Sequence, residues 1–182
     1  MGAEQPDAAS GGRLPLLILT LLLMVAALTR LYGLEVQSLW NDELSSWGKS
    51  NHPTISRVIE KGVARDRHPP GYRLLLHGMI RGLGDSPTLL RLPSAIAGVF
   101  SVGLIFWLGT ALYSWREGLL AAGLLTGSWT AIFNGQEATP NTLLLMLCLA
   151  KSLAAWKLLL GLQRDRAVLG PAIFYVLAAA LT

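Results

Sequence analysis

The stretch that decides the fold is LPSAIAGVFSVGLIFWLGTALY, which runs from Leu92 to Tyr113 and holds 22 consecutive uncharged residues. At about 1.5 Å of rise per residue, a helix of this length crosses a hydrocarbon core about 30 Å thick. A helix also pairs its backbone polar groups within the segment, as an apolar medium requires. The stretch is therefore predicted to be a transmembrane helix.

Further apolar runs lie on both sides of this stretch, so the predicted fold class is an all-α, multi-pass transmembrane protein. A signal peptide is the alternative for the first run, but no small-residue cleavage site follows Arg30. The last run is still apolar at Thr182, so we expect the chain to be the N-terminal part of a longer protein. The predicted division is a flexible tail at 1–13, one membrane region at 14–182, and spans at about 14–32, 88–113, 118–136, 141–162 and 167–182.

The composition supports this class and excludes several others. Hydrophobic residues make up 52% of the 182 residues and charged residues only 14%, against about 25% charged in soluble domains. A soluble globular enzyme and a disordered chain are both excluded by these values. Cys148 is the single cysteine, so neither an internal disulfide nor a thiolate metal site can form. The net charge of +4 is scattered between apolar runs, which favours lipid phosphate over nucleic acid as a partner.

Residues 33–87 are predicted to form a long first outer loop that carries two interfacial helices. In the segment Pro70 to Leu83, Arg73, His77 and Arg81 follow each other at four-residue spacing and share one helical face, opposite an apolar face. A similar amphipathic pattern covers 53–65. Three arginines lie in the short loops at 114–117 and 163–166, which the positive-inside rule places in the cytoplasm. The loops 33–87 and 134–140 then lie on the non-cytoplasmic face.

Acidic residues in these outer loops are the candidate catalytic groups. Asp42 and Glu43 are adjacent and flanked by Trp40 and Trp47, and Glu137 lies in the short outer loop. One interpretation is a capped helix start at an aromatic belt. The alternative is a glycosyl-transfer site, in which a carboxylate takes the proton of an acceptor hydroxyl as it attacks the sugar. A carboxylate there could also hold a metal or stabilise a cationic sugar centre.

Four basic residues are the candidates for contact with a lipid phosphate: Arg67, His68, Arg73 and Arg91. Arg67 and His68 precede Pro69 and Pro70, which hold the chain away from helical geometry and can start the following helix. The start of a helix with an arginine beside it suits a phosphate group. A rigid turn with solvated charges is the alternative for this segment.

Several motifs, taken in order, resemble the N-terminal region of the polytopic glycosyltransferases with the GT-C fold, the group of dolichyl-phosphate-mannose protein mannosyltransferases and aminoarabinose transferases. The motifs are LWNDE at 39–43, HPPGYRLLLH at 68–77, GDS at 84–86 with LRLPSA at 90–95, and QEA at 136–138. The resemblance implies transfer of a sugar from a polyprenyl-phosphate donor to a hydroxyl of a protein, lipid or glycan. It places the reaction on the non-cytoplasmic face of the cell membrane, and a single inverting displacement fits this chemistry. It also puts Asp42 at the position of the catalytic acid, Glu137 at that of a second acid, and His68 near the lipid phosphate.

The sequence departs from this family at several positions. Related aminoarabinose transferases have an acid and a lysine where Arg67 and His68 stand, which leaves a divalent metal as an open question. Thr139 replaces an arginine of many relatives, and Asn141 replaces an acid of some. The alternatives to an enzyme are a non-catalytic membrane module or truncated fragment that assembles with another subunit, and a fragment of a transporter or flippase. We expect the 182 residues alone to be inactive, because proximity catalysis requires both substrates to be held.

Overall fold

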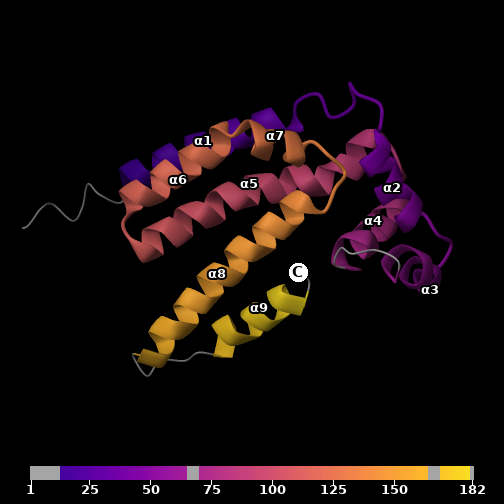
Figure 1. The fold of residues 1–182 in the computed structure, drawn as a ribbon. Helices are drawn as coiled ribbons and strands as arrows, with labels where there is room; N and C mark the ends of the chain where they lie inside the picture. Colours follow the sequence, from indigo (N-terminus) through magenta and orange to yellow (C-terminus); the bar gives the residue numbers. More distant parts are fainter. Residues whose placement is uncertain (1–12, 65–69, 164–168, 181–182) are drawn as a thin grey trace, which may run out of the picture.

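The computed structural model describes residues 13–64, 70–163 and 169–180, and within these ranges it contains helices and no strand. The predicted all-α class is therefore confirmed. Figure 1 shows a bundle of long helices with a cluster of short helices at one end. The elements are α1 (Arg13–Leu31), α2 (Asn41–Ser50), α3 (Ile55–Arg57), the π-helix η1 (Val58–Val63), α4 (Pro70–Gly82), α5 (Pro87–Leu112), α6 (Trp115–Gly127), α7 (Trp129–Gly135), α8 (Asn141–Gln163) and α9 (Leu169–Ala180).

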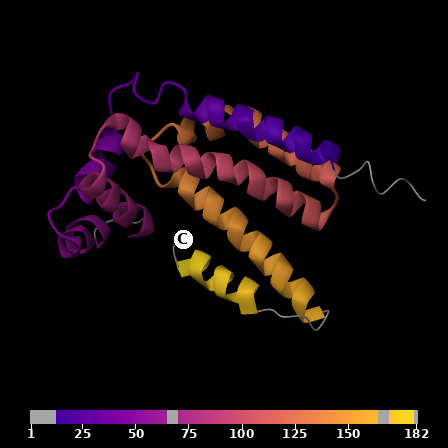
Figure 2. The ribbon, with the colours of Figure 1, turned by 180° about the vertical axis from the view of Figure 1, so that it is seen from behind.

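Three helices of the described ranges, α1, α5 and α8, are long and apolar enough to cross a membrane. The 26-residue α5 lies at the centre and contacts α1, α6 and α8, while α9 packs along α8 (Figure 2). Leu19 and Ala26 of α1 form a buried core with Val102, Phe106 and Ala122. Most of the remaining apolar surface is exposed, as expected for helices that face lipid.

The segment 118–136, predicted as one span, is divided into α6 and α7. Ser128 between them has an extended conformation, with φ −67° and ψ 116°. Its Oγ atom accepts a hydrogen bond of 3.4 Å from the backbone N–H of Ala131, which caps the start of α7. Serine favours such a break because its hydroxyl competes with the helical backbone for hydrogen bonds. The apolar pattern alone carries no sign of this interruption.

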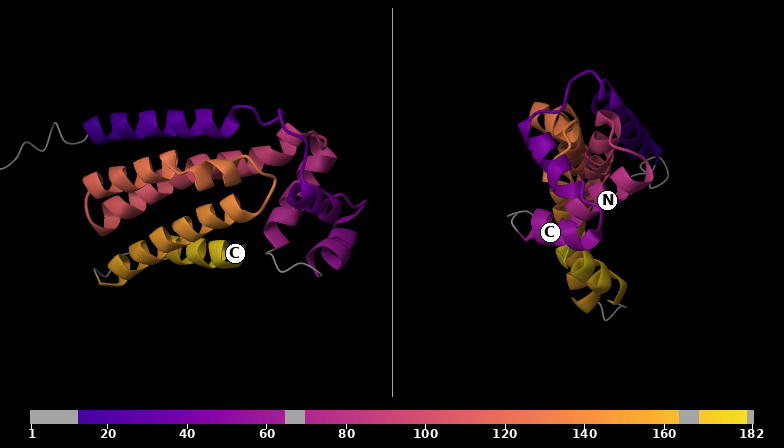
Figure 3. Two further views of the ribbon diagram at one scale, coloured as in Figure 1. Left: turned by 45° about the horizontal axis from the view of Figure 1, so that its top comes forward. Right: turned by 90° about the vertical axis from the view of Figure 1, so that its right-hand side faces the viewer.

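The first outer loop folds into α2, α3, η1 and α4, which gather beyond the end of α5 (Figure 3). The polar face of α4 packs against α2 and not toward water, so Arg73 and His77 are buried. The ring atom Nδ1 of His77 lies 3.1 Å from the carbonyl oxygen of Ser50 on α2. Leu75 on the other face is 41% exposed. Arg73, a candidate for contact with a lipid phosphate, is thus covered by a neighbouring helix, whereas Arg81 of the same stripe is exposed.

Close approach of α5 and α6 depends on Gly118. A Cβ atom at this position would lie 2.6 Å from the carbonyl oxygen of Phe106 and 2.5 Å from Oγ1 of Thr110. The first of these atoms is rigid helix backbone, so a side chain at 118 requires the two helices to separate. Small residues at helix contacts serve this purpose in membrane proteins.

We predict that Gly118→Ala destabilises the bundle, while Gly123→Ala in the same helix does not. A Cβ atom at Gly123 meets nothing within 4 Å, and replacing glycine by alanine in a helix gains roughly 0.5–1 kcal/mol. Thermal unfolding of both variants in detergent measures the difference, and we expect a lower midpoint for Gly118→Ala alone. Equal midpoints for the two variants would contradict the packing role of Gly118.

Candidate functional site

The motif around Asp42 and Glu43 forms the first turn of α2 and sends its two carboxylates in different directions. Glu43 is fully buried, whereas Asp42 is exposed. One oxygen of Glu43, Oε2, accepts a hydrogen bond of 3.3 Å from the backbone N–H of Trp40. This bond closes the start of the helix, where backbone N–H groups lack helical partners. The two adjacent acids therefore have different surroundings, one inside the protein and one at its surface.

Glu43 forms a bidentate ion pair with Arg91 of α5. The atoms Nε and Nη2 of Arg91 each lie 2.7 Å from one carboxylate oxygen of Glu43. The three remaining N–H groups of Arg91 bind the carbonyl oxygens of Leu34, Gln37 and Ser38. A guanidinium group has five N–H donors, so Arg91 has none left for a phosphate. This differs from the expectation that Arg91 contacts a lipid phosphate.

Glu43 also binds the second outer loop, which follows α7. The backbone N–H of Ala138 donates a hydrogen bond of 2.8 Å to Oε1 of Glu43. In the same loop, the side-chain nitrogen Nε2 of Gln136 donates to the carbonyl oxygens of Thr29 and Tyr32 at the end of α1. The two loops predicted on one side of the membrane are thus joined at one end of the bundle.

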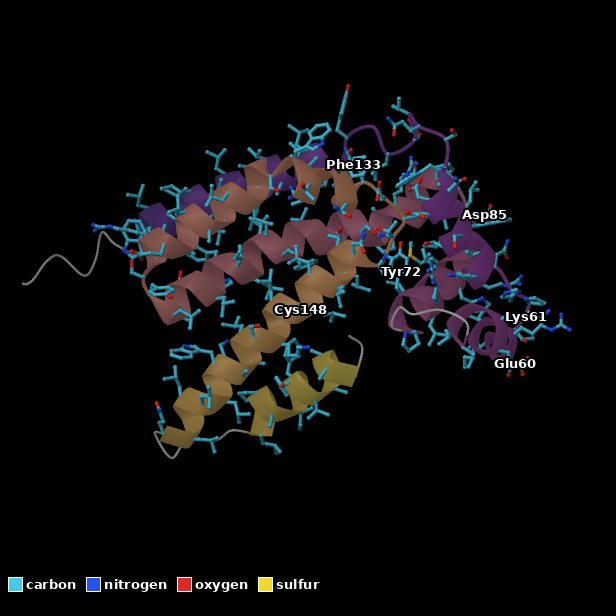
Figure 4. The ribbon with its side chains drawn as sticks, in the orientation of Figure 1. Glu60, Lys61, Tyr72, Asp85, Phe133 and Cys148 are labelled. Atoms are coloured by element: carbon cyan, nitrogen blue, oxygen red, sulfur yellow. The ribbon has the colours of Figure 1, made fainter. Side chains whose placement is uncertain are left out.

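These contacts leave Glu137 beside a small cavity with no partner for one of its oxygens. The residue is 7% exposed, and its Oε1 atom is buried without a hydrogen bond. Phe133, labelled in Figure 4, also borders this cavity, and its ring lies 6.5 Å from that of Trp40. The cavity holds about 120 Å³ and is lined by Gln37, Ser38, Trp40, Glu43, Arg91, Phe133, Gln136 and Glu137.

The pKa values of the two buried acids, Glu137 and Glu43, are shifted in opposite directions. Burial raises the pKa of Glu137, the charges of Glu43 and Asp42 raise it further, and the pKa reaches about 7 although Arg91 opposes the shift. For Glu43, burial also acts to raise the pKa, but the hydrogen bonds from Arg91 and Ala138 and the charge of Arg91 outweigh it, so the pKa is lowered. Glu43 therefore stays ionised near neutral pH, while Glu137 is poised to exchange a proton.

The structure brings Asp42, Glu43 and Glu137 to one end of the bundle, as expected from their positions in the two loops. Arg73 lies elsewhere, on α4, with its guanidinium 5.9 Å from the ring centre of Tyr72. Arg67 and His68 lie outside the described residues. Within the part of the chain that the structure describes, no three histidine, cysteine or acidic side chains gather as metal ligands. Sequence reasoning gave no role to Gln136, although it stands in the motif that carries Glu137.

Comparison with protein families agrees with this arrangement. The profile of one family, dolichyl-phosphate-mannose-protein mannosyltransferase, matches residues 67–182, more than half of the chain. The chain belongs to this family. The resemblance noted from the motifs is thus confirmed, and the chain is a membrane protein of the mannosyltransferase type of glycosyltransferase. Arg91 and Glu137 lie inside the matched segment, and Asp42 and Glu43 precede it. Comparison with curated proteins and with solved structures gives no significant match.

We predict that Glu43→Gln destabilises the protein by about 3–5 kcal/mol, because it leaves the guanidinium of Arg91 buried without its counter-charge. Glu35→Gln, which removes an exposed acid of the same loop, is the control. Thermal unfolding in detergent measures both effects. The double variant Glu43→Gln/Arg91→Met should recover part of the loss, since it removes both buried charges. A midpoint for Glu43→Gln equal to that of Glu35→Gln would contradict the role of the pair.

We also predict that Glu137→Gln stabilises the protein at pH 8 but not at pH 4. The pKa of Glu137 is about 7 in the folded protein and 4.5 ordinarily. The stability that comes from the protonated carboxyl group is therefore fully present below pH 4.5, and it is lost as the pH rises through 7. Above pH 7 the ionised carboxylate lowers the free energy of unfolding by up to about 3 kcal/mol, and the neutral amide of glutamine avoids this loss. Unfolding midpoints at both pH values measure the difference. A gain of equal size at pH 4 and pH 8 would contradict the shifted pKa.

Proposed function

We propose that the protein moves a sugar from a polyprenyl-phosphate donor to a hydroxyl acceptor on the non-cytoplasmic face of the cell membrane. The observation that carries this proposal is Glu137, a buried carboxyl group with a pKa of about 7 beside a cavity, under the influence of the charge of Asp42. A pKa near neutrality in a cavity is typical of groups that exchange protons during catalysis. Membership of the family supports the reaction type.

Asp42 is the proposed general base. It is exposed in the first turn of α2, where an acceptor hydroxyl can reach it from outside the bundle. Its carboxylate takes the proton of that hydroxyl while the hydroxyl oxygen bonds to the anomeric carbon of the sugar. The bond from this carbon to the phosphate oxygen breaks, and the polyprenyl phosphate leaves with the electron pair. One such displacement inverts the anomeric centre without a covalent enzyme intermediate.

Glu43 and Glu137 have supporting roles in this proposal. Glu43 is ionised and bound to Arg91 and to the backbone N–H of Ala138, so it acts as a positioning residue that fixes both outer loops. Its charge also helps to hold the pKa of Glu137 near 7. Glu137 can then give or take a proton at neutral pH next to the substrates, and its unpaired oxygen Oε1 is free to bind one of them.

The donor phosphate requires cations that are not already bound. Arg91 is excluded from this role because all five of its donors bind Glu43 and backbone carbonyls. We assign the role to Arg67 and His68, which stand three and two residues before Pro70, the first residue of α4. An arginine beside a helix start suits a phosphate through its charge and its paired N–H groups. The acceptor is a hydroxyl of a protein, a lipid or a glycan.

The test is Asp42→Asn in the intact protein, reconstituted in liposomes with polyprenyl-phosphate-linked sugars. Asp42 is exposed and asparagine keeps its shape, so the fold should be kept, but the amide cannot take a proton. We expect transfer to fall by about 100- to 10,000-fold. Glu35→Gln is the matched control for loss of an exposed acid and should leave the rate unchanged. A rate for Asp42→Asn within a few-fold of the parent would remove Asp42 from the role of base.

A further inference from the structure

Gln136 borders the cavity of Glu137, yet the proposed sugar transfer gives it no role. It directly follows the last residue of α7 and directly precedes Glu137 in the chain. Its side-chain nitrogen Nε2 donates a hydrogen bond of 2.8 Å to the carbonyl oxygen of Thr29 and one of 3.0 Å to that of Tyr32. A primary amide has two N–H donors, so both are used at this one point of the fold.

The end of α1 needs hydrogen-bond donors from elsewhere in the protein. The last four carbonyl groups of an α-helix have no N–H partner within the helix, and they carry partial negative charge. Thr29 belongs to the last turn of α1, and Tyr32 follows the helix. Gln136 supplies donors to both carbonyl groups, which ties the residue before Glu137 to one of the long apolar helices.

The residue before Gln136 contacts α1 as well. A Cβ atom at Gly135 would lie 3.2 Å from Cγ and 3.3 Å from Cδ of Arg30, so the backbone at the end of α7 packs directly on this side chain. Arg30 is buried, and its Nη2 atom donates to the carbonyl oxygen of Leu125 at 3.0 Å. Gly135 and Gln136 therefore hold the chain immediately before Glu137 against the end of α1.

The chain after Glu137 is held by two other elements. The backbone N–H of Ala138 donates to Glu43 of α2, and the carbonyl oxygen of Thr139 accepts a hydrogen bond of 3.0 Å from Oγ of Ser94 on α5. Glu137 is thus the central residue of a short segment that is bound on both sides. Its Oε1 atom is buried and has no hydrogen-bond partner among the described residues. Such a position is unfavourable, so the backbone around Glu137 must impose it.

We propose that Gln136 is a positioning residue, which holds the carboxyl group of Glu137 at the cavity by binding the end of α1. Without these two hydrogen bonds the chain before Glu137 can rotate, and a rotation there carries the carboxyl group towards water. Gln136 acts through Glu137 and needs no contact with a substrate. Its part in sugar transfer rests on the proposed function, whereas its effect on Glu137 can be measured without any transfer.

Infrared spectroscopy of the intact protein in detergent tests the proposal through the titration of Glu137. A protonated carboxyl group has its own C=O band, and the band that is missing from Glu137→Gln identifies this residue. In the parent we expect the band to disappear as the pH rises through about 7. Gln136→Met keeps the length of the side chain and removes both donors. We expect the pKa of Glu137 in this variant to fall towards 4.5, because the carboxyl group reaches water.

Two controls separate positioning from a loss of stability. Gln163→Met makes the same exchange at an exposed glutamine, the last residue of α8, and should leave the titration of Glu137 unchanged. Gly118→Ala, which we expect to destabilise the contact of α5 with α6, should leave it unchanged as well. Gln136→Asn, whose amide is one methylene shorter, is the second variant if Gln136→Met does not fold, with the same expected direction. Titration of Glu137 at the pH of the parent in a folded Gln136 variant would overturn the proposal.

Transfer assays of the same variants in liposomes measure the effect of this positioning on the reaction. We expect Gln136→Met to lower kcat by about 10- to 100-fold, because a misplacement of about 1 Å can have an effect of this size. The double variant Gln136→Met/Glu137→Gln should have the kcat of Glu137→Gln, since Gln136 acts through Glu137. A loss equal to the product of the two single losses would contradict this. A parent without transfer would contradict the proposed function instead, and the titration would then decide the role of Gln136.

Discussion

The ion pair between Glu43 and Arg91 is the interaction on which the end of the bundle near α2 depends. Two hydrogen bonds of 2.7 Å join the side chains, and further bonds reach from them to Trp40, Ala138 and the backbone before α2. One buried pair therefore holds the first outer loop, the start of α5 and the second outer loop together. A buried ion pair is favourable only when its remaining donors and acceptors are satisfied, and the surrounding backbone meets this condition here.

The same pair sets the electrostatics of the candidate site. Arg91 keeps Glu43 ionised, and the resulting carboxylate helps to raise the pKa of the nearby Glu137 to about 7. Two buried acids at one end of the bundle thus differ in charge at neutral pH because only one of them has a cationic partner. The exposed Asp42 adds a third acid at the same end of the bundle.

Among the buried arginines of the described residues, Arg91 and Arg30 have different hydrogen-bond partners. All five N–H groups of Arg91 donate hydrogen bonds to Glu43 and to backbone carbonyl oxygens, so this side chain stabilises the fold. The Nε atom of Arg30 is buried without a hydrogen-bond partner, and Arg30 has no carboxylate partner among the described residues. Arg91 lines the cavity of Glu137, whereas Arg30 lines a different cavity on another part of α7.

The sequence by itself determined the helical class and the long apolar helices, because apolar runs and helical spacing are local properties of the chain. Only the tertiary structure decided which of the candidate residues are free to act. Asp42 and Glu43 are adjacent in sequence, yet one is exposed and the other buried, since the turn of α2 points them apart. Arg91 and Arg73 were equal candidates for phosphate until packing covered both. Burial and the supply of hydrogen-bond partners depend on contacts between distant segments, which no local pattern records.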